Sequence, residues 1–339
     1  MATVGSIVYA TKSGLGILAK LLYEAKIIDK VLVVQHPKFD SHIEWYESED
    51  TFWGRSGDTT GGDEFLKSID TLFLLEAPLP DPFDWALVQK AKYLGKKVVL
   101  MPMYESTPRQ HLSVAVDQII CPSELDLEYF RDFDSTFIPV PSPNDVEWNL
   151  RETANVFVHN VGHGGIFSRN GTVELIEALP LIKSDIKLII RIQPDAGPEL
   201  LDLVDKVDDP RVEVVTKQIP FSELWSTGDV FLFPEKFNGL SLPLQEAYTA
   251  GMCVMAGDRF PINRWLPQEP LIPVKGHFYT ELPWIGIKVK NAIMEPQDIA
   301  STIDNWAGKD ITKLSLRGKE WAKTNNGESL KPQYDRILR

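Results

Sequence analysis

The feature that most restricts the fold is a repeated alternation of short β-branched runs with amphipathic stretches of helical length. Such alternation is typical of a parallel sheet that is covered by helices on both faces. The first half of the chain is therefore predicted to be one Rossmann-like domain. Its expected strands are Ser6–Ala10, Val31–Gln35, Thr71–Glu76, Lys97–Met101 and Gln118–Cys121, and its expected helices are Leu15–Ala25, Asp84–Tyr93 and Ser123–Phe130.

The alternation starts again after the Pro-rich stretch Pro139–Pro143. Pairs of a residue and a following proline favour extended backbone, so Val140–Arg151 is predicted to be the linker. A chain of 339 residues has room for two domains, which we expect at residues 1–143 and 144–325. In the second domain the expected strands are Val156–Val161, Ile186–Ile192, Val212–Val215, Val230–Phe233 and Cys253–Ala256, and the expected helices are Thr172–Ala178, Pro198–Val204 and Pro243–Ala250.

The charge of the chain limits its partners. The chain has 48 Asp and Glu but only 35 Lys and Arg, which gives a formal net charge of −13. The electric field of such a negative protein repels nucleic-acid backbones and anionic bilayers. No stretch of 18 consecutive apolar residues and no N-terminal leader pattern occur, so we expect a cytoplasmic protein without integral membrane contact. Cys121 and Cys253 lie far apart within apolar runs, as buried reduced thiols do.

The strongest functional signal lies between Asp229 and Asp258. A buried strand leads into a loop with Asn238 and Gly239, and then into a helix with Pro243 in its first turn. A ligand at the carboxyl end of that strand would meet the free N–H groups of the helix N-terminus, which suit a phosphate. Glu246, within the helix, could accept hydrogen bonds from a ribose diol. The alternative is that Glu246 is a solvated helix residue and that the glycines only form turns.

Residues 238–251 resemble the nucleotide-sugar motif of the large retaining family of GT-B glycosyltransferases, E-G-F-G-[LI]-P-x-x-E-A-x-A-x-G. The second glutamate, which binds the ribose in that family, is present as Glu246. The first glutamate, which contacts the donor sugar, is replaced by the uncharged amide Asn238, and Glu235 is a nearby carboxylate that could substitute for it. The resemblance implies an α/β GT-B fold, two Rossmann-like domains facing across a cleft, with residues 326–339 returning to the N-terminal domain.

Two further segments resemble the family's donor-binding elements. A strand, a glycine turn and a basic pair bind the donor pyrophosphate in that family; here His163 takes the arginine position, and the lysine position falls on Asn170 or is shifted to Arg169. A Gly-rich loop follows the first strand, where missing side chains let the backbone approach the substrates. The donor-binding residues that the resemblance implies are Gly14, Gly16, His163, Arg169, Asn170, Glu235, Asn238, Gly239, Leu240, Ser241 and Glu246.

The catalytic and acceptor-binding candidates are fewer. Arg169 would stabilise the charge that grows on the leaving diphosphate, and Glu105 and Arg109 fall where related enzymes place loops of the first domain; the alternative for these two is a surface loop. The acidic, aromatic segment Asp40–Glu64 is either an acceptor-binding flap, with Trp45 or Trp53 stacking on a sugar or base, or a partly ordered insertion.

The sequence predicts neither a metal nor a cofactor beyond the nucleotide sugar. Asp132 and Asp134 have the spacing of a metal-binding carboxylate pair, but they follow an expected helix, so a solvated turn is predicted. His159 and His163 are separated by the end of a strand and Gly162, so they lack the helical face that a zinc pair of this spacing needs.

The prediction is therefore a glycosyltransferase that moves a sugar from a nucleotide-sugar donor, with UDP- and GDP-sugars the first candidates. The resemblance implies transfer with retention and without metal. The acceptor stays open: a carbohydrate, a glycolipid, a protein or a modified nucleobase in DNA, although the net charge disfavours DNA. The sequence is also compatible with a non-catalytic protein of the same fold that binds nucleotide sugars or carbohydrates, and with a sugar-nucleotide epimerase.

Overall fold

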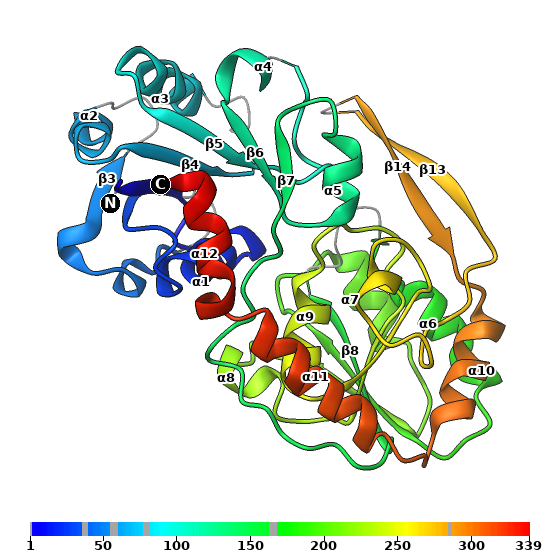
Figure 1. Cartoon of the computed structure of the whole chain (residues 1–339). Coiled ribbons are helices and arrows are strands. Elements are labelled where there is room, and N and C mark those ends of the chain that lie inside the picture. The colour runs from blue at the N-terminus through cyan, green and yellow to red at the C-terminus, as the bar shows by residue number, and fades with distance from the viewer. Residues whose placement is uncertain are drawn as a thin grey trace. The chain divides into compact units, whose positions relative to one another are not determined.

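The chain forms two compact α/β units (Figure 1). The computed structural model describes residues 2–35, 40–54, 60–76, 82–110, 112–162, 168–283 and 286–339. Unit 1 comprises Met1–Ser142, Pro283–Gly286 and Lys323–Arg339, and unit 2 comprises Pro143–Leu282 and Ile287–Ala322. Each unit thus contains its own sheet and its own core.

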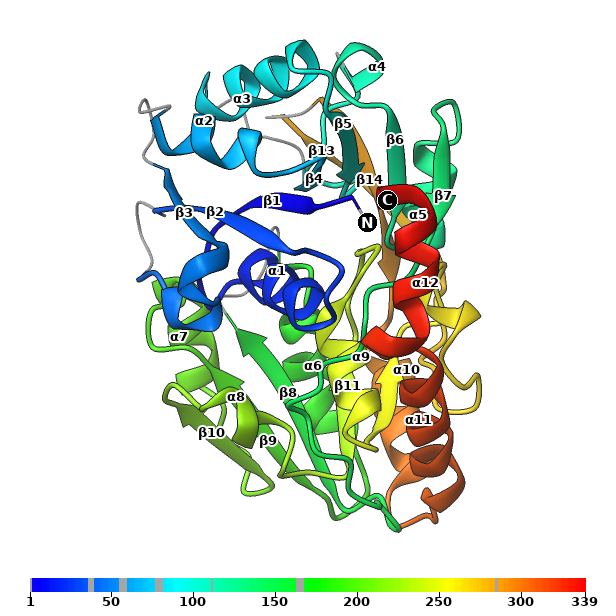
Figure 2. The ribbon, with the colours of Figure 1, turned by 60° about the vertical axis from the view of Figure 1, so that its left-hand side comes forward.

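Unit 1 is built on a seven-stranded, all-parallel sheet with the order β3-β2-β1-β4-β5-β6-β7. Helices α2 and α3 cover one face of this sheet, and α1 and α12 lie together on the other (Figures 1 and 2). The elements are β1 (Val4–Val8), α1 (Gly14–Glu24), β2 (Lys30–Val34), β3 (Thr51–Gly54), α2 (Thr60–Lys67), β4 (Thr71–Leu75), α3 (Pro82–Tyr93), β5 (Lys97–Met101), α4 (Leu112–Ala115), β6 (Gln118–Cys121), α5 (Glu124–Tyr129), β7 (Ser135–Phe137) and α12 (Gly327–Leu338).

The segment Asp40–Glu64 differs from its prediction as a flap or an insertion. It contains β3, which pairs in parallel with β2 and is the edge strand of the sheet, and it continues into α2. Phe52 on β3 packs edge-on against Phe65 on α2, with ring centroids 5.7 Å apart. A strand of four residues with glycine at its end carries too little periodicity to be recognised from sequence.

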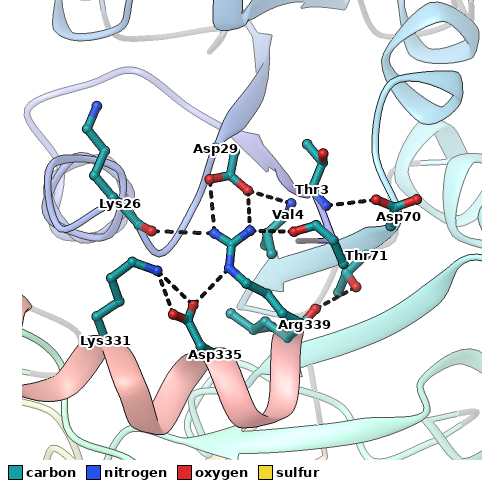
Figure 3. Close-up of polar contacts among 11 residues, drawn as sticks. Thr3, Val4, Lys26, Asp29, Asp70, Thr71, Lys331, Asp335 and Arg339 are labelled. Atoms are coloured by element: carbon teal, nitrogen blue, oxygen red, sulfur yellow. Dashed lines mark hydrogen bonds and ion pairs between the residues drawn. The ribbon is translucent and has the colours of Figure 1, made fainter.

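Helix α12 belongs to unit 1, although the whole second sheet lies between it and β7 in the sequence. Its Tyr334 is fully buried, lies edge-on to Phe73 at 6.3 Å between ring centroids, and donates a hydrogen bond to the Pro139 carbonyl at 3.0 Å. At the end of the helix the Arg339 guanidinium makes two hydrogen bonds, 2.8 and 2.9 Å long, to the carboxylate of Asp29 (Figure 3). These contacts attach the helix to the first sheet.

Unit 2 is built on a five-stranded, all-parallel sheet with the order β10-β9-β8-β11-β12. Outside this sheet lie an antiparallel ribbon, β13 with β14, and helices α10 and α11. The elements are β8 (Val156–Gly162), α6 (Thr172–Ala178), β9 (Lys187–Ile192), α7 (Pro198–Asp205), β10 (Val212–Thr216), α8 (Phe221–Leu224), β11 (Val230–Phe233), α9 (Leu242–Thr249), β12 (Cys253–Ala256), β13 (Gly276–Leu282), β14 (Ile287–Ile293), α10 (Pro296–Trp306) and α11 (Thr312–Thr324).

Both faces of this second sheet are buried. Side chains alternate along each strand: on β11, Val230 and Leu232 join a cluster with α6, α7 and α10, whereas Phe231 and Phe233 join a cluster with α8 and α9. Both cysteines are buried free thiols. No helix in the described part of the chain is long and apolar enough to cross a membrane.

Candidate functional site

The order of the strands singles out one edge of the unit 2 sheet. Strands β8 and β11 are neighbours, but the chain leaves β8 toward β9 and leaves β11 toward β12 on the opposite side. Ligands of open α/β sheets bind at the carboxyl ends of strands where the order reverses in this way. Two loops meet at this switch point: the described end of the loop after β8, residues 168–171, and residues 234–241 after β11. His163 lies outside the described residues.

The centre of the second loop is the carboxylate of Glu235, whose side chain is 2% exposed. Its Oε1 accepts a hydrogen bond from the Asn238 amide at 2.9 Å, and its Oε2 accepts one from the Ser241 hydroxyl at 2.8 Å. Oε2 also accepts a hydrogen bond from Arg259 Nη2 at 2.8 Å. In this structure Glu235 therefore binds protein groups through both of its oxygens, whereas the sequence suggested it as a contact of the donor sugar.

Arg259 is the residue of this network that sequence reasoning missed. It comes from the turn after β12, it is buried, and it also donates to the main-chain carbonyls of Glu235 at 2.9 Å and Asn238 at 2.8 Å. Its one sequence signal is its place three residues beyond a buried strand that neighbours β11.

Asn238 and Ser241 are turned toward this network. While the Asn238 amide nitrogen donates to Glu235, its Oδ1 accepts a hydrogen bond from the Ser241 main-chain N–H at 3.1 Å. Ser241 precedes α9 and has φ of 46°, a left-handed conformation that costs free energy in a residue other than glycine; the family pattern has glycine at this position. The bond of the Ser241 hydroxyl to Glu235 holds the serine in that conformation.

The first loop contributes Arg169 and Asn170. Arg169 Nε lies 3.9 Å from Glu235 Oε1, and its side chain keeps 24% of its surface exposed. The Asn170 amide donates to the carbonyl of Val161 at 2.8 Å and so fixes the loop to the end of β8. The next residue, Gly171, has φ of 72°, and a Cβ there would lie 2.2 Å from the carbonyl oxygen of Pro234. Only glycine lets the two loops approach this closely.

Glu246 is buried within α9, so the alternative of a solvated helix residue is wrong. Burial raises the pKa of its carboxyl group to about 8, and the charge of Asp145 adds to this rise. Leu240 is buried as well, and its carbonyl accepts a hydrogen bond from Gln245 at 2.7 Å. The structure therefore brings Arg169, Glu235, Asn238 and Ser241 into one network, with Glu246 on the helix that follows.

In unit 1 the two glycines after β1 belong to a helix rather than to the predicted loop. Helix α1 begins at Gly14, and the Ser13 hydroxyl caps it by accepting a hydrogen bond from the Gly16 N–H. A Cβ on Gly16 would lie 2.0 Å from the carbonyl oxygen of Thr11, whereas a Cβ on Gly14 would meet nothing within 4 Å. Of these two positions, only residue 16 must be a glycine for the helix to pass this close to the backbone of Thr11.

We expect Gly16→Ala to lower the free energy of unfolding by about 1–3 kcal/mol, because the backbone of Thr11 must move to admit the methyl group. Gly14→Ala, in the same helical turn, is the control and should be neutral or slightly stabilising, by about 0.5 kcal/mol, because alanine is the better helix former. Urea denaturation of both variants measures the difference. Equal effects would show that Gly16 has no special steric role.

Glu105 lies beside a second buried acid. Burial raises the pKa of Asp126 to about 7, and the negative charge of Glu105 adds to the rise. Asp126 also accepts a hydrogen bond from the Tyr104 N–H at 2.8 Å and one from the Ser123 hydroxyl. The hydrogen bond from Tyr104 to Asp126 thus joins the loop after β5 to α5, and Glu105 is buried rather than part of an exposed surface loop.

The three acceptor-binding candidates occupy separate settings in unit 1. Arg109 pairs with Asp132 at 2.7 Å, and its guanidinium lies over the rings of Tyr129 and Phe133. Trp45 stacks on His42, with ring centroids 5.0 Å apart. Trp53, on the edge strand, is 53% exposed. We find no contact that joins these residues within the described part of unit 1.

The groups considered as metal ligands have other partners. His159 is fully buried, and its ring nitrogens bond the Leu232 carbonyl and the Thr172 hydroxyl, each at 2.9 Å; burial lowers its pKa to about 4. Asp132 binds Arg109, and Asp134 accepts a hydrogen bond from Gln118 at 2.9 Å. Within the ranges that the structure describes, no three His, Cys, Asp or Glu side chains gather as a metal site would require.

Searches of protein-family models and of curated proteins find no match to this chain. Solved structures do match it over its whole length. HepE of Anabaena, in complex with UDP-glucose, is 13% identical, with 100% of this chain and 99% of that one covered and a TM-score of 0.66. Sucrose-phosphate synthase of Thermosynechococcus elongatus is 16% identical, with 99% and 98% covered and a TM-score of 0.64.

A third match is the apo form of the lipopolysaccharide outer core galactosyltransferase WaaB, which is 13% identical, with 99% of both chains covered and a TM-score of 0.63. At such identities the similarity shows a shared fold. The prediction of two Rossmann-like units with the GT-B fold is confirmed.

Proposed function

We propose that this protein is a glycosyltransferase that uses a nucleotide-sugar donor. The observation that carries the proposal is the match of the whole chain, both units included, to GT-B structures among which one is a galactosyltransferase and another is bound to UDP-glucose. The switch point of unit 2 adds chemical support, because it places a cation and a helix N-terminus after neighbouring strands.

In this proposal the candidate residues of unit 2 bind different parts of the donor. Arg169, with His163 and the N–H groups around Gly239 and Leu240, would bind the diphosphate and stabilise the charge that develops on it as the sugar leaves. Glu246 would accept hydrogen bonds from the ribose. With these groups supplying the positive field, we propose transfer without a metal ion, and with retention at the sugar, as the resemblance to the retaining family implies.

The donor nucleotide is proposed to be UDP, because HepE, a match over the full length of the chain, is bound to UDP-glucose. Glu105 is the candidate catalytic acid or base on the acceptor side, and Trp45, Trp53 and Arg109 are candidates for binding the acceptor. A carbohydrate, glycolipid or protein acceptor suits the net charge of −13 better than DNA does.

A second candidate function is supported by two asparagines. Asn238 stands where the family pattern has a glutamate, Asn170 is one of the two residues on which its lysine position can fall, and both amides make hydrogen bonds within the protein. The loss of these charges is compatible with a protein of this fold that binds nucleotide sugars or carbohydrates without transferring them.

A thermal-shift screen with UDP-, GDP-, ADP-, CMP- and dTDP-sugars tests the proposal, with magnesium and with EDTA. We expect UDP-sugars to raise the melting temperature in both conditions; saturation at 100 times Kd is worth about 2.7 kcal/mol. Arg169→Ala should reduce the shift, whereas Arg336→Ala, an exposed arginine in unit 1, should leave it unchanged. A protein that no nucleotide sugar stabilises would contradict the proposal, and binding without hydrolysis or transfer would favour the second candidate.

A further inference from the structure

The loop after β11 is closed by a buried ion pair whose two members come from different parts of the chain. Glu235 lies directly after the strand, and Arg259 follows the next strand, β12. Their side chains are 2% and 5% exposed, and Arg259 Nη2 lies 2.8 Å from Glu235 Oε2. A buried charge of this kind is tolerated only when its partner and its hydrogen bonds are all in place.

The guanidinium of Arg259 uses three nitrogens for three acceptors. Nε binds the Glu235 carbonyl, Nη1 binds the Asn238 carbonyl, and Nη2 binds the Glu235 carboxylate. The planar shape of the group fixes these acceptors relative to one another, which a lysine ammonium cannot do. One side chain thereby sets the path of the backbone at both Glu235 and Asn238.

The same network determines how α9 begins. The Glu235 carboxylate holds the Ser241 hydroxyl, and Asn238 Oδ1 holds the Ser241 N–H. Ser241 keeps its left-handed conformation at the start of the helix through these bonds. Whatever binds to the N–H groups at this helix start meets a backbone that Arg259 and Glu235 have fixed.

We propose that Arg259 is a positioning residue of the donor site and that Asn238 serves the same network instead of contacting the donor sugar through its side chain. This inference rests on the proposed function, because it concerns the loop that would bind the nucleotide. Arg259 acts on the donor through the backbone of residues 235–241.

The first test needs no ligand. Hydrogen–deuterium exchange of the full chain should show at least tenfold faster exchange at residues 235–242 in Arg259→Met, and a smaller increase in Arg259→Lys, which keeps the charge but loses the planar contacts. Arg211→Met is the matched control: Arg211 in the same unit also binds a carboxylate, that of Asp209, and main-chain carbonyls, but away from this loop. Unchanged exchange at residues 235–242 in Arg259→Met, or an equal increase in Arg211→Met, would overturn the inference.

The second test uses UDP and UDP-glucose as probes in calorimetric titrations. We expect Arg259→Met to weaken binding of both at least tenfold, with partial rescue in Arg259→Lys and no change in Arg211→Met. Asn238→Asp would set a second carboxylate against Glu235, so it should also increase exchange in the loop and weaken both probes equally. If Asn238→Asp weakens binding of UDP-glucose but not of UDP, and exchange in the loop is unchanged, Asn238 contacts the sugar. That result would overturn the proposed role of Asn238 in the network.

The two proposals fail in different ways. If the wild-type protein binds neither probe but exchange rises only in the Arg259 variants, the proposed function fails and the control of the loop by Arg259 stands. If the wild-type protein binds UDP and the Arg259 variants bind it equally well, the inference fails and the proposed function stands. Should Arg259→Met not fold, Arg259→Lys and Ser241→Ala give the same comparisons with milder changes.

Discussion

Tyr334→Ala is expected to lower the free energy of unfolding by about 3–5 kcal/mol, the range for removing a large buried aromatic side chain. Tyr334 is fully buried, packs on Phe73 of β4, and bonds the Pro139 carbonyl. Its loss leaves a cavity between α12 and the sheet and an unpaired carbonyl. Since Arg339 holds the end of the same helix to Asp29 (Figure 3), loosening of α12 should also expose that ion pair to water.

Urea denaturation measures this effect, and two controls separate its causes. Tyr334→Phe keeps the ring and loses only the hydrogen bond, so about 1 kcal/mol is expected. Tyr93→Ala removes a side chain that is 89% exposed and should change stability by less than about 0.5 kcal/mol. If Tyr334→Ala behaves like Tyr93→Ala, α12 is not a structural part of unit 1.

Glu246→Gln is expected to change the dependence of stability on pH. Burial raises the pKa of Glu246 from 4.5 to about 8 in the folded protein, so the folded state favours the neutral acid. The stability that this preference contributes is fully present below pH 4.5 and is lost as the pH rises to about 8. Relative to the glutamine variant, the wild-type protein should therefore lose at most about 5 kcal/mol across this window.

Denaturation of both proteins at pH 5.5, 7 and 8.5 tests this. The difference in unfolding free energy between them should move steadily in favour of glutamine as the pH rises. Glu223→Gln, at an exposed position in α8 of the same unit, is the control for the substitution itself. A difference that stays constant with pH for Glu246→Gln would mean that the carboxyl group of Glu246 is solvated in the folded protein.

Three strands could be predicted closely because each is a short run of buried apolar residues. Lys97–Met101, Val230–Phe233 and Cys253–Ala256 begin and end as expected. Strands with few buried residues were harder to predict: β3 and β7, at the edges of the first sheet, were missed, whereas β12, an edge strand that is buried throughout, was predicted. The ribbon of β13 and β14 and the helix α10 were missed too, because they lie outside the alternation of strands and helices on which the prediction rested.

The residues of the candidate site also differ in how far the sequence could predict them. Local motifs identified the loop with Glu235, Asn238 and Ser241, because a strand, a loop and a helix follow one another within a few residues. Arg259 acts at a distance of 24 residues from Glu235, and nothing in its own surroundings shows which carboxylate it meets. The Asn238 side chain turns toward Glu235, whose carboxylate Arg259 holds in place. A local motif does not encode this tertiary contact.

The return of residues 323–339 to unit 1 has a consequence for biosynthesis. The ribosome produces the seven strands of the first sheet before it produces α12, and all of residues 143–322 come in between. The apolar surface around Phe73 that Tyr334 covers therefore stays open while the second sheet is made and can fold. In this chain the N-terminal unit is completed last, so its nascent form is the one for which protection by chaperones matters most.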